Sequence, residues 1–414
     1  MVDNKVPQIR FKGFEEDISS RKLEDVVLSN TYGPRFNAND YDLNGNVKTI
    51  RGTDITISGD ILYNQVPLAN LDTNLIKSHI LGDGDLVMIT TADCGLTGIF
   101  EDQNDKYICS AYAIKISLNK RLVFPQYFKY FFQTTFAKNE VNKLIRKATV
   151  ANLPASDVLK LTHKLPSKKE QEKIALFLTS LYKLIEQKEM KHQKLKQFKK
   201  AMLDKMFPKN GANVPEIRFD GFSGEWKYKK FGECVLIQRG GSPRPIENYI
   251  TNNKNGINWI KIGDVSTESR YVTHTKQKII PEGEKNSRKV LKGDLILSNS
   301  MSFGRPYIMA IDGCIHDGWL LIRDERHIFN LEYLLQLLSS DYMLNQYKAL
   351  ASGGVVINLN SELVQSTNVF VPDIKEQTKI GNYFQKLDKQ IELQNKEIQK
   401  LKNIKKASLD KMFV

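Results

Sequence analysis

The feature that most constrains this 414-residue chain is an internal repeat. The leader VPQIRFKGF at residues 6–14 returns as VPEIRFDGF at residues 214–222. A second motif, KKAMLDKMF at residues 199–207, returns as KKASLDKMF at residues 405–413. A repeat of this length indicates a tandem duplication of one folding unit. Each half is long enough to bury a core of its own.

Composition excludes several classes of protein. No run of about 18 apolar residues is present, so the sequence predicts no membrane span and no membrane partner. The residues at 1–5 lead into no apolar stretch, so no secretory signal is expected, and we predict a cytoplasmic location. The four cysteines have no CxxC spacing and are expected to be reduced core residues rather than disulfides or zinc ligands: Cys94, Cys109, Cys234 and Cys314.

The net charge of +14 favours a polyanionic partner, with nucleic acid first and a membrane surface, the less favoured polyanion, second. The charge is concentrated in two segments. Residues 168–207 hold 11 Lys against 5 acidic residues, and residues 373–413 hold 10 Lys against 6. These lysines also suit the solvated faces of two long helices, so composition alone does not establish DNA binding.

Each half contains a globular segment of short apolar runs separated by Gly, Asn and Asp turns, a pattern typical of strands. Residues 84–90 and 291–298 each predict a turn that leads into a strand. An amphipathic helix is expected over Pro125–Phe136 in the first half and over Leu331–Tyr347 in the second.

Both halves end in a pattern that predicts a long helix. The helices are expected to begin near Pro166 and Pro372, because proline is favoured in the first helical turn. Apolar residues then recur at alternating steps of three and four, as in a coiled coil. They are Ile174, Leu178, Leu181, Ile185, Leu195 and Met202 in the first helix, and Ile380, Phe384, Leu387, Ile391, Ile398 and Leu401 in the second. About 40 residues would give a rod of roughly 60 Å.

The fold class predicted from these patterns is α+β. Two mixed α/β domains at 1–164 and 208–370 would each be followed by a spacer helix, at 165–207 and 371–414. We expect the two helices to pair as an antiparallel coiled coil, which gives a direct repeat a pseudo-two-fold axis like that of duplex DNA. The alternatives are that each helix packs on its own domain or drives homodimerisation.

The order of these parts resembles the specificity (S) subunit of type I restriction-modification systems. That family has two dissimilar target-recognition domains, each followed by a similar long helix. The helix starts carry the resemblance: LPSKKEQEKI at residues 165–174 and VPDIKEQTKI at residues 371–380 share Pro, then Glu-Gln-x-Lys-Ile. The resemblance covers the full chain.

The resemblance implies a non-catalytic subunit that reads two separated half-sites in double-stranded DNA. It further implies that the subunit holds two modification (methyltransferase) subunits, to which two restriction subunits are added. No cofactor is expected in this chain. S-adenosylmethionine is expected in the modification subunits, and ATP and magnesium in the restriction subunits. The family also suggests adenine as the methylated base.

No catalytic motif contradicts that expectation. The sequence has no methyltransferase cofactor loop with an Asn/Asp-Pro-Pro-Tyr/Phe motif, and no Walker loop. Pro372-Asp373 is not followed by the Glu-x-Lys of a nuclease. His316-Asp317 cannot form a triad alone and is better explained as a turn. The six histidines are scattered and predict no metal site.

DNA recognition needs phosphate contacts for position and base-edge contacts for sequence. Arg and Lys suit guanine, Asn and Gln suit adenine, and Ser and Thr suit either. Polar loops at matching places in both halves therefore supply the candidates. The candidate DNA-binding residues are Arg35, Arg51, Thr90, Thr91, Lys147, Thr149 and Asn152 in the first half, and Arg244, Lys261, Asn299, Ser300, Arg305, Gly353, Gly354 and Asn358 in the second.

Arg35 is matched with Arg244, and Arg51 with Lys261, and these four are favoured because both members of each pair are basic. Every candidate also suits an ordinary surface turn. The sequence therefore predicts a sequence-specific DNA-recognition scaffold. A protein-binding coiled-coil scaffold without DNA specificity and a stand-alone nuclease remain the alternatives.

Overall fold

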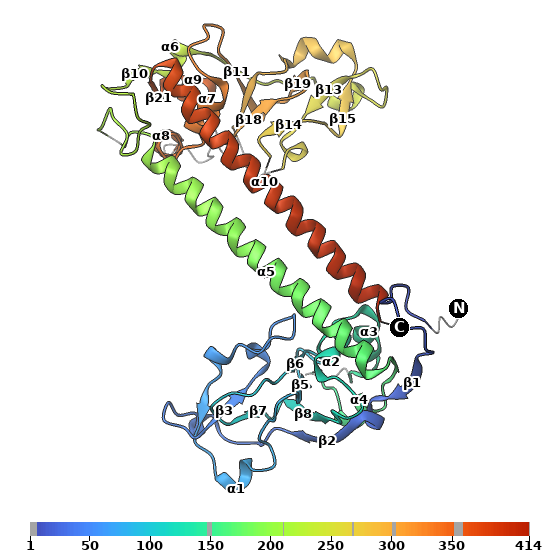
Figure 1. Cartoon of the computed structure of the whole chain (residues 1–414). Coiled ribbons are helices and arrows are strands. Elements are labelled where there is room, and N and C mark those ends of the chain that lie inside the picture. Colours follow the sequence, from blue (N-terminus) through green and yellow to red (C-terminus); the bar gives the residue numbers. More distant parts are fainter. Residues whose placement is uncertain are drawn as a thin grey trace. The chain divides into compact units, whose positions relative to one another are not determined.

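The computed structural model describes residues 6–146, 151–209, 211–266, 269–299, 304–351 and 359–413. The chain divides into two compact units. Unit 1 comprises Met1–Glu189 and Lys396–Val414, and unit 2 comprises Met190–Asn395. Two long helices, α5 (Lys168–Lys205) and α10 (Ile374–Lys411), pack together, and each unit contains part of both (Figure 1).

Unit 1 contains a four-stranded antiparallel sheet in the order β2-β8-β5-β6 and a three-stranded sheet in the order β4-β3-β7, in which β3 and β7 are parallel. The central strands β5 and β8 are buried on both faces, which explains why their sequences are almost continuously apolar. The strands are β1 (Ser19–Lys22), β2 (Val27–Tyr32), β3 (Val47–Ile50), β4 (Leu68–Ala69), β5 (Leu86–Ile89), β6 (Thr97–Ile99), β7 (Tyr107–Cys109), β8 (Ala113–Leu118) and β9 (Thr162–Leu165); the short helices are α1 (Thr73–Ile76), α2 (Pro125–Phe131), α3 (Thr135–Leu144) and α4 (Ala155–Leu159).

Unit 2 repeats this plan with longer sheets. Its two five-stranded sheets have the orders β11-β20-β17-β18-β14 and β12-β15-β13-β19-β16, and β13 and β19 are parallel as β3 and β7 are. The strands are β10 (Lys227–Lys230), β11 (Leu236–Arg239), β12 (Ile250–Thr251), β13 (Ile257–Ile260), β14 (Tyr271–Val272), β15 (Gln277–Ile279), β16 (Arg288–Val290), β17 (Leu295–Ser298), β18 (Pro306–Met309), β19 (Gly313–Ile315), β20 (Trp319–Arg323) and β21 (Asn368–Val371); the short helices are α6 (Phe231–Cys234), α7 (Leu331–Ser339), α8 (Asp341–Ala351) and α9 (Ser361–Ser366).

The expected turns before β5 and β17 are present. Gly84 and Gly293 have φ values of +81° and +95°, a backbone conformation that favours glycine. The amphipathic helices, however, are each interrupted, so the expected spans Pro125–Phe136 and Leu331–Tyr347 are wrong. Thr134 and Ser340 break them: each hydroxyl donates to a carbonyl three residues earlier and accepts the N–H three residues later.

The motif Glu-Gln-x-Lys-Ile joins each long helix to its globular part. The arginine of the leader donates two hydrogen bonds to the buried glutamate of the motif. The distances are 2.7 and 2.8 Å both for Arg10 with Glu170 and for Arg218 with Glu376. The glutamine side chain of the motif forms hydrogen bonds with backbone groups at the start of α2 or α7. Gln171 Oε1 accepts the N–H of Phe124 at 3.0 Å, and Gln377 Oε1 accepts the N–H of Asn330 at 2.8 Å.

The lysine and isoleucine of the motif complete this joint. Lys173 lies over the rings of Phe11 and Phe14, and Lys379 lies over the rings of Phe219 and Phe222. Ile174 and Ile380 enter the hydrophobic cores of unit 1 and unit 2. The repeated leader and the repeated helix start therefore have one structural purpose, since they pack on each other in both units.

The motif Met-Phe at the end of each long helix enters a core as well. Met206 and Phe207, at the end of α5, pack in unit 2 beside Trp226 and Tyr333. Met412 and Phe413, at the end of α10, pack in unit 1 beside Tyr127 and Phe131. Each unit thus contains the start of one long helix and the end of the other.

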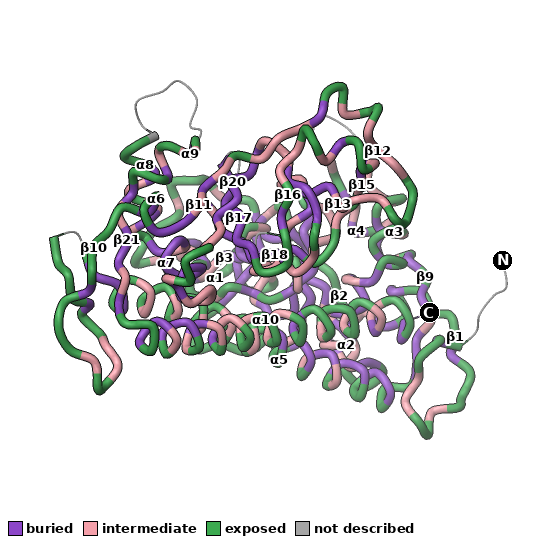
Figure 2. The backbone as a smooth tube through the Cα atoms, turned by 90° about the horizontal axis from the view of Figure 1, so that it is seen from above, coloured by how far each residue is buried: buried purple, intermediate pink, exposed green. Residues whose placement is uncertain are grey.

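The contacts between α5 and α10 run in opposite directions along the two helices. In unit 1, Lys405 Nζ lies 3.8 Å from the ring centroid of Tyr182, and Lys188 pairs with Glu397 at 2.7 Å. In unit 2, Lys199 pairs with Asp388 at 2.6 Å. Figure 2 shows that both helices expose much of their surface, as their lysine-rich sequences predict.

The predicted α+β class and the antiparallel pairing of the long helices are therefore confirmed. Of the predicted seam residues, Ile174, Leu178, Leu181, Ile185, Ile380, Phe384, Leu387 and Ile398 are buried. The predicted domain boundaries at residues 164, 207 and 370 separate the proposed DNA-reading domains from the spacer helices. These boundaries stay a prediction. Within the described ranges, no helix is both long and apolar enough to cross a membrane.

Candidate nucleic-acid interface

The first pair of candidate residues follows equivalent strands of the smaller sheets. Arg51 comes after β3 and Lys261 after β13, and each precedes a short 3-10 helix, Gly52–Asp54 or Ile262–Asp264. The backbone N–H of each candidate donates to the aspartate three residues later, at 2.8 Å for Arg51 and 2.9 Å for Lys261. The sequence match between these two loops is therefore also a match of backbone structure.

The side chains at this shared position differ in what they bind. The Arg51 guanidinium donates twice to Asp54, at 3.0 and 2.9 Å, and is 43% exposed. Lys261 Nζ instead donates to Gln277 Oε1 at 2.6 Å. One loop thus presents a guanidinium fixed by a carboxylate, and the other an ammonium group beside an amide.

The second pair of candidates is offset in the structure. Gly33 N–H donates to Ala113 O at 3.1 Å, and Gly240 N–H donates to Trp319 O at 2.8 Å. A Cβ on either glycine would lie 2.0 Å from a backbone oxygen, so both glycines stand at the same tight approach. Gly33 is therefore equivalent to Gly240 rather than to Ser242.

This register changes the match proposed for Arg35. Counting from the equivalent glycines, Arg35 corresponds to Ser242, and Arg244 lies two residues further along. Arg35 is exposed and, among the described residues, has no ion pair. Arg244 is 79% exposed and its guanidinium donates to Asp317 Oδ2 at 3.3 Å.

Asp317 lies in a turn, as its sequence predicts, and it also joins candidate residues from distant parts of the chain. Its carboxylate accepts hydrogen bonds from Ser242 and Arg244, and its carbonyl accepts from Asn299 at 2.8 Å. Burial would raise the pKa of Asp317, but the bond from Ser242 and the nearby His316 and Arg244 lower it below its usual value. The group is therefore a carboxylate at neutral pH.

His316 ties this turn to the loop of Lys261. Its Nε2 accepts the backbone N–H of Ile262 at 3.2 Å. Burial is the main cause that lowers the pKa of His316, so the ring is neutral at pH 7. The histidine is thus a structural link within the candidate interface rather than an acid or a base. The turn of Asp317 gives no sequence signal beyond adjacent polar residues, so its importance could not be inferred earlier.

Thr90 and Asn299 occupy equivalent positions at the ends of β5 and β17, but both are buried. The Thr90 hydroxyl donates to Tyr112 O at 2.9 Å, and the Asn299 amide donates to Asp317 O. Their carbonyls accept equivalent N–H groups, from Leu153 at 2.8 Å and from Leu359 at 3.1 Å. The structure therefore makes these two residues supports for the adjacent loops.

Thr91 and Asn152 lie beside this support. They form an isolated antiparallel bridge, and Asn152 also exchanges two backbone hydrogen bonds with Arg146. Asn152 is exposed and Thr91 is half-buried. Six further candidates lie outside the described residues: Lys147, Thr149, Ser300, Gly353, Gly354 and Asn358.

Arg305 follows Gly304, which has a φ of +71° and is equivalent to Gly95, with a φ of +86°. Both glycines donate their N–H to the last residue of the preceding strand, Ile89 O in unit 1 and Ser298 O in unit 2. Arg305 therefore corresponds to Leu96 in unit 1. Its guanidinium carbon lies 5.8 Å from the ring centroid of Tyr307.

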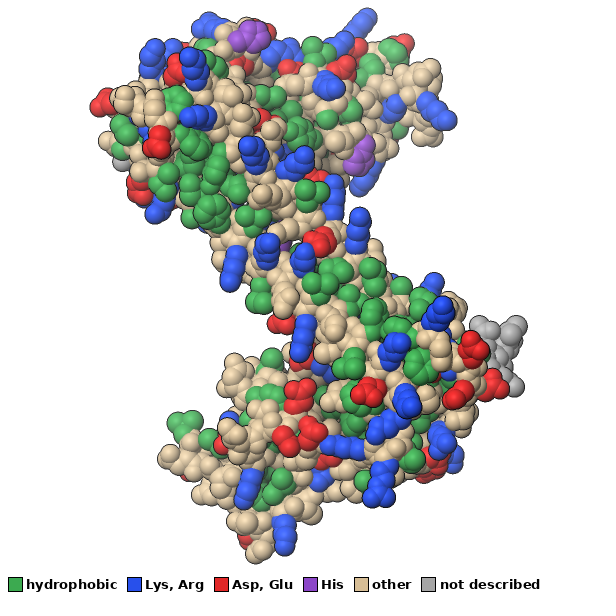
Figure 3. All heavy atoms as spheres, viewed as in Figure 1, with side chains coloured by type: hydrophobic (Ala, Val, Ile, Leu, Met, Phe, Trp, Pro, Cys, Tyr) green, Lys and Arg blue, Asp and Glu red, His purple; other side chains and the backbone are tan. Residues whose placement is uncertain are grey.

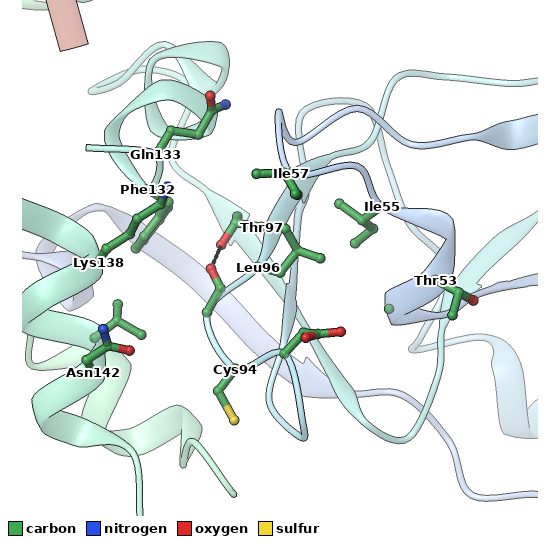
Figure 4. A pocket seen from close by; sticks show the side chains of 14 residues that line it. Thr53, Ile55, Ile57, Cys94, Leu96, Thr97, Phe132, Gln133, Lys138 and Asn142 are labelled. Carbon is green, nitrogen blue, oxygen red and sulfur yellow. Dashed lines mark hydrogen bonds between the residues drawn. The ribbon is translucent and has the colours of Figure 1, made fainter. Parts of the chain in front are cut away.

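Each unit has a cavity beside this glycine. In unit 1 a cavity of about 580 Å³ is lined largely by uncharged side chains, including Ile55, Ile57, Leu96 and Phe132, with Lys138 at its edge (Figure 4). In unit 2 a cavity of about 600 Å³ includes Gly304, Arg305 and Pro306, together with lysines of α5. The same place in the fold therefore has one acidic and one basic side chain in unit 1, Asp93 and Lys138, and an excess of basic side chains in unit 2.

Lysine and arginine side chains are spread over both units on the face seen in Figure 3, with acidic side chains between them. Over the described part of the chain, no group of three or more His, Cys, Asp or Glu side chains is arranged to hold a metal ion. The arrangement offers hydrogen-bond donors and cations on turns, which suits recognition of a polyanion.

Comparison with known proteins identifies the family. The family model described as the type I restriction modification DNA specificity domain matches residues 15–197 and 223–403, well over half of the chain. The chain belongs to this type I restriction-modification specificity family. Its two matched segments correspond to the two halves of the repeat.

Two relatives from Methanocaldococcus jannaschii are similar in sequence. The specificity subunit of the type I restriction enzyme MjaVIII is 26% identical over 266 residues, which are 59% of this chain and 60% of that protein. The putative type I restriction enzyme MjaX specificity subunit is 22% identical over 330 residues, 76% of this chain and 73% of that protein. The first match thus covers less than two thirds of the relative's length.

Two solved structures have a similar fold. The S subunit of a type I restriction-modification system from M. genitalium aligns with a TM-score of 0.61 at 15% identity, covering 99% of both chains. A chain from a study of complex assembly and conformational transition of the type I R-M system aligns with a TM-score of 0.58 at 18% identity, covering 97% of this chain and 99% of that one. These similarities show the fold of the specificity family.

Membership of the specificity family confirms the sequence-based prediction that the chain is a non-catalytic specificity subunit.

Proposed function

We propose that this specificity subunit reads a bipartite DNA site, with one half-site read by the domain at 1–164 and the other by the domain at 208–370. The helices at 165–207 and 371–414 would then set the gap between the half-sites. Each well-placed base contact would contribute roughly 1–3 kcal/mol of discrimination against the wrong base.

The observation that carries this proposal is a shared backbone framework with different side chains. The loops after β3 and β13 have the same hydrogen bonds to an aspartate, but present Arg51 in one unit and Lys261 in the other. Arg35 likewise corresponds to Ser242. A duplicated reader whose two halves recognise different bases requires this combination.

We propose different roles for the candidate residues according to their exposure. Arg35, Arg51, Asn152, Arg244 and Lys261 are exposed or half-buried on turns and are proposed to contact bases or phosphates. Thr90 and Asn299 are proposed to position loops, since they are buried and hydrogen-bonded. Thr91 stays a candidate, and so do the residues outside the described ranges: Lys147, Thr149, Ser300, Gly353, Gly354 and Asn358.

The partners proposed for this chain are those of the family. Two modification subunits would bind the long helices, and two restriction subunits would join them. S-adenosylmethionine would be bound by the modification subunits, and ATP and magnesium by the restriction subunits, with none of these cofactors in this chain. We further propose adenine as the methylated base.

The test is a domain exchange in the assembled complex. Residues 15–164 are replaced by the corresponding segment of another specificity subunit, the chain is co-expressed with its modification subunit, and methylated positions are mapped across the genome. We expect one half-site to change and the other to persist. A change in both half-sites would contradict the assignment of one half-site to each domain.

A second test addresses the spacer. Four residues inserted into the first helix should change the length of the unread gap while the same bases are recognised. A methylated motif with an unchanged gap would refute the spacer assignment.

A chain that only binds protein is distinguished by salt. For the DNA reader, the logarithm of the affinity for duplex DNA should fall linearly with the logarithm of the salt concentration. A protein scaffold should have no such affinity. A stand-alone nuclease would cut plasmid in the presence of magnesium, and we expect the isolated chain to leave it intact.

A further inference from the structure

The cavity of unit 2 beside Arg305 continues into a larger one of about 910 Å³, and we call the two together the charged cavity. Both parts share Lys196, Lys199, Arg270, Arg305 and Asp388. The larger part is lined by six basic side chains and two acidic ones, since Lys386, Lys389 and Glu392 of α10 complete its charged lining.

The floor of the charged cavity is a compact network of paired charges. Lys199 Nζ donates to Asp388 Oδ1 at 2.6 Å, and Arg270 Nε lies 3.2 Å from Asp388 Oδ2. Arg270 also bonds to Glu332, whose carboxylate accepts from Tyr271 at 2.9 Å. Two cations and two carboxylates therefore neutralise each other and fix the shape of the floor.

The rim carries the excess positive charge. Arg305, Lys386 and Lys389 have no ion pair with any described residue, and both lysines are exposed on α10. Burial is the main cause that lowers the pKa of Lys199 beneath them, and the positive charges of Arg270 and Arg305 act in the same direction. The cavity is therefore a site of positive potential, in which an anion would be favoured.

The equivalent place in unit 1 lacks the arginine and the ion pair of the charged cavity. Leu96 stands where unit 2 has Arg305, as the equivalent glycines before them show. Lys405 lies over the ring of Tyr182, where unit 2 has the ion pair of Lys199 with Asp388. The excess of positive charge is thus found in the cavity of unit 2, whereas the cavity of unit 1 is lined by one acidic and one basic side chain.

We propose that the charged cavity binds phosphate groups of the DNA backbone next to the half-site read by the second domain. This rests on the proposed function, since DNA is the polyanion that the chain is proposed to bind. A rim of lysines and an arginine around a neutral floor matches phosphates, which carry charge but no sequence information. Arg305 then contacts the backbone, and DNA is held more firmly at one domain than at the other.

The test compares the full chain in complex with its modification subunits. Arg305→Leu gives unit 2 the residue of unit 1, and Lys386→Gln/Lys389→Gln removes two exposed charges from α10. Affinity for duplex DNA is measured from 50 to 200 mM salt, with and without the methylated motif in the duplex. Lys400→Gln, which removes one exposed charge of α10 outside the cavity, is the matched control.

Each phosphate contact contributes about 0.9 to the slope of log affinity against log salt. The fall in affinity over this fourfold salt range should therefore become about threefold smaller for each contact removed. We expect this reduction for the cavity variants on both kinds of duplex and none for Lys400→Gln. The bases methylated by the α10 double variant should be those of the unaltered complex.

Three results would overturn the proposal: slopes that do not change in either cavity variant, an equal change in Lys400→Gln, or altered bases in the methylated motif of the double variant. All three require an unaltered complex that binds and methylates a bipartite site. If the unaltered complex has no bipartite motif at all, the proposed function itself fails, so the two failures are distinct.

Discussion

The joint between leader and long helix makes a quantitative prediction about stability. Glu376 is 1% exposed and accepts two bonds from Arg218, at 2.7 and 2.8 Å, and one from Trp226 at 3.1 Å. Arg218→Met leaves this buried carboxylate with Trp226 alone. Loss of one partner of a buried pair costs about 3–5 kcal/mol, because an uncompensated charge stays in the interior.

Tryptophan fluorescence during urea unfolding measures this loss in unit 2 only. The chain has three tryptophans, Trp226, Trp259 and Trp319, and all of them belong to unit 2. With an m-value of about 2–3 kcal/mol per molar urea, a loss of 4 kcal/mol lowers the midpoint by about 1.5 M. The matched control is Arg10→Met, which breaks the equivalent pair in unit 1 and should move the tryptophan signal much less.

The double variant Arg218→Met/Glu376→Gln separates charge from packing. Glutamine is neutral and can still accept the N–H of Trp226, so the double variant should recover at least about 1.5 kcal/mol relative to Arg218→Met. If the double variant is as unstable as Arg218→Met, the loss comes from packing of the leader, and the reasoning about a buried charge is refuted.

Three further predictions concern unit 1. Burial lowers the pKa of His163 to about 4, whereas its pKa in the unfolded chain is about 6.5. As the pH falls, the unfolded chain therefore takes up the proton first. The free energy of unfolding should be highest above pH 6.5 and should fall by about 3 kcal/mol as the pH drops to 4. Unfolding measured across this range should show a flatter profile for His163→Phe, and an equally steep profile would exclude this histidine as the cause. Phe413→Ala removes a ring that packs on Tyr127 and Phe131 and should cost about 3–5 kcal/mol, seen as faster proteolysis of unit 1; resistance equal to that of the unaltered chain would contradict the packing assigned to the helix end. Gly95→Ala should cost about 2 kcal/mol in thermal unfolding, because the φ of +86° is strained for alanine and its Cβ would lie 2.6 Å from Val141 Cγ1, whereas Gly82→Ala, with no backbone strain and only a contact at 3.9 Å, should be nearly neutral.

Much of the fold could be predicted from sequence because its signals are local or repeated. The heptad steps from Ile174 to Ile185 and from Ile380 to Ile398 predict the paired helices. The breaks at Thr134 and Ser340 were missed, because the apolar spacing continues across them and only the hydroxyls, in contact with the backbone, reveal the new helix starts. The Glu-Gln-x-Lys-Ile motif was recognised, but its partner, the leader arginine, lies about 160 residues away in sequence.

The candidate site was harder to predict. Sequence patterns select polar residues on turns but do not show burial, so Thr90 and Asn299 look like Arg51 and Lys261 until their contacts are known. The predicted match of Arg35 with Arg244 is offset by two residues in the structure, because the chain has two more residues between Gly240 and Arg244 than between Gly33 and Arg35. Asp317 gained its importance only through residues distant in sequence, Ser242 and Asn299.

The joint at the leader has a consequence for how such chains diversify. Ile217 N–H donates to Lys205 O at 3.0 Å where the peptide chain runs through the joint, and Ile9 N–H donates to Lys411 O at 3.0 Å where it does not. The leader thus packs in the same way on the end of a long helix, whether or not a short peptide segment connects the two. A genetic crossover between the repeats would yield a hybrid in which the leader and the long helix still make these contacts. New pairs of domains can therefore arise by recombination without further changes in the leader or the helices.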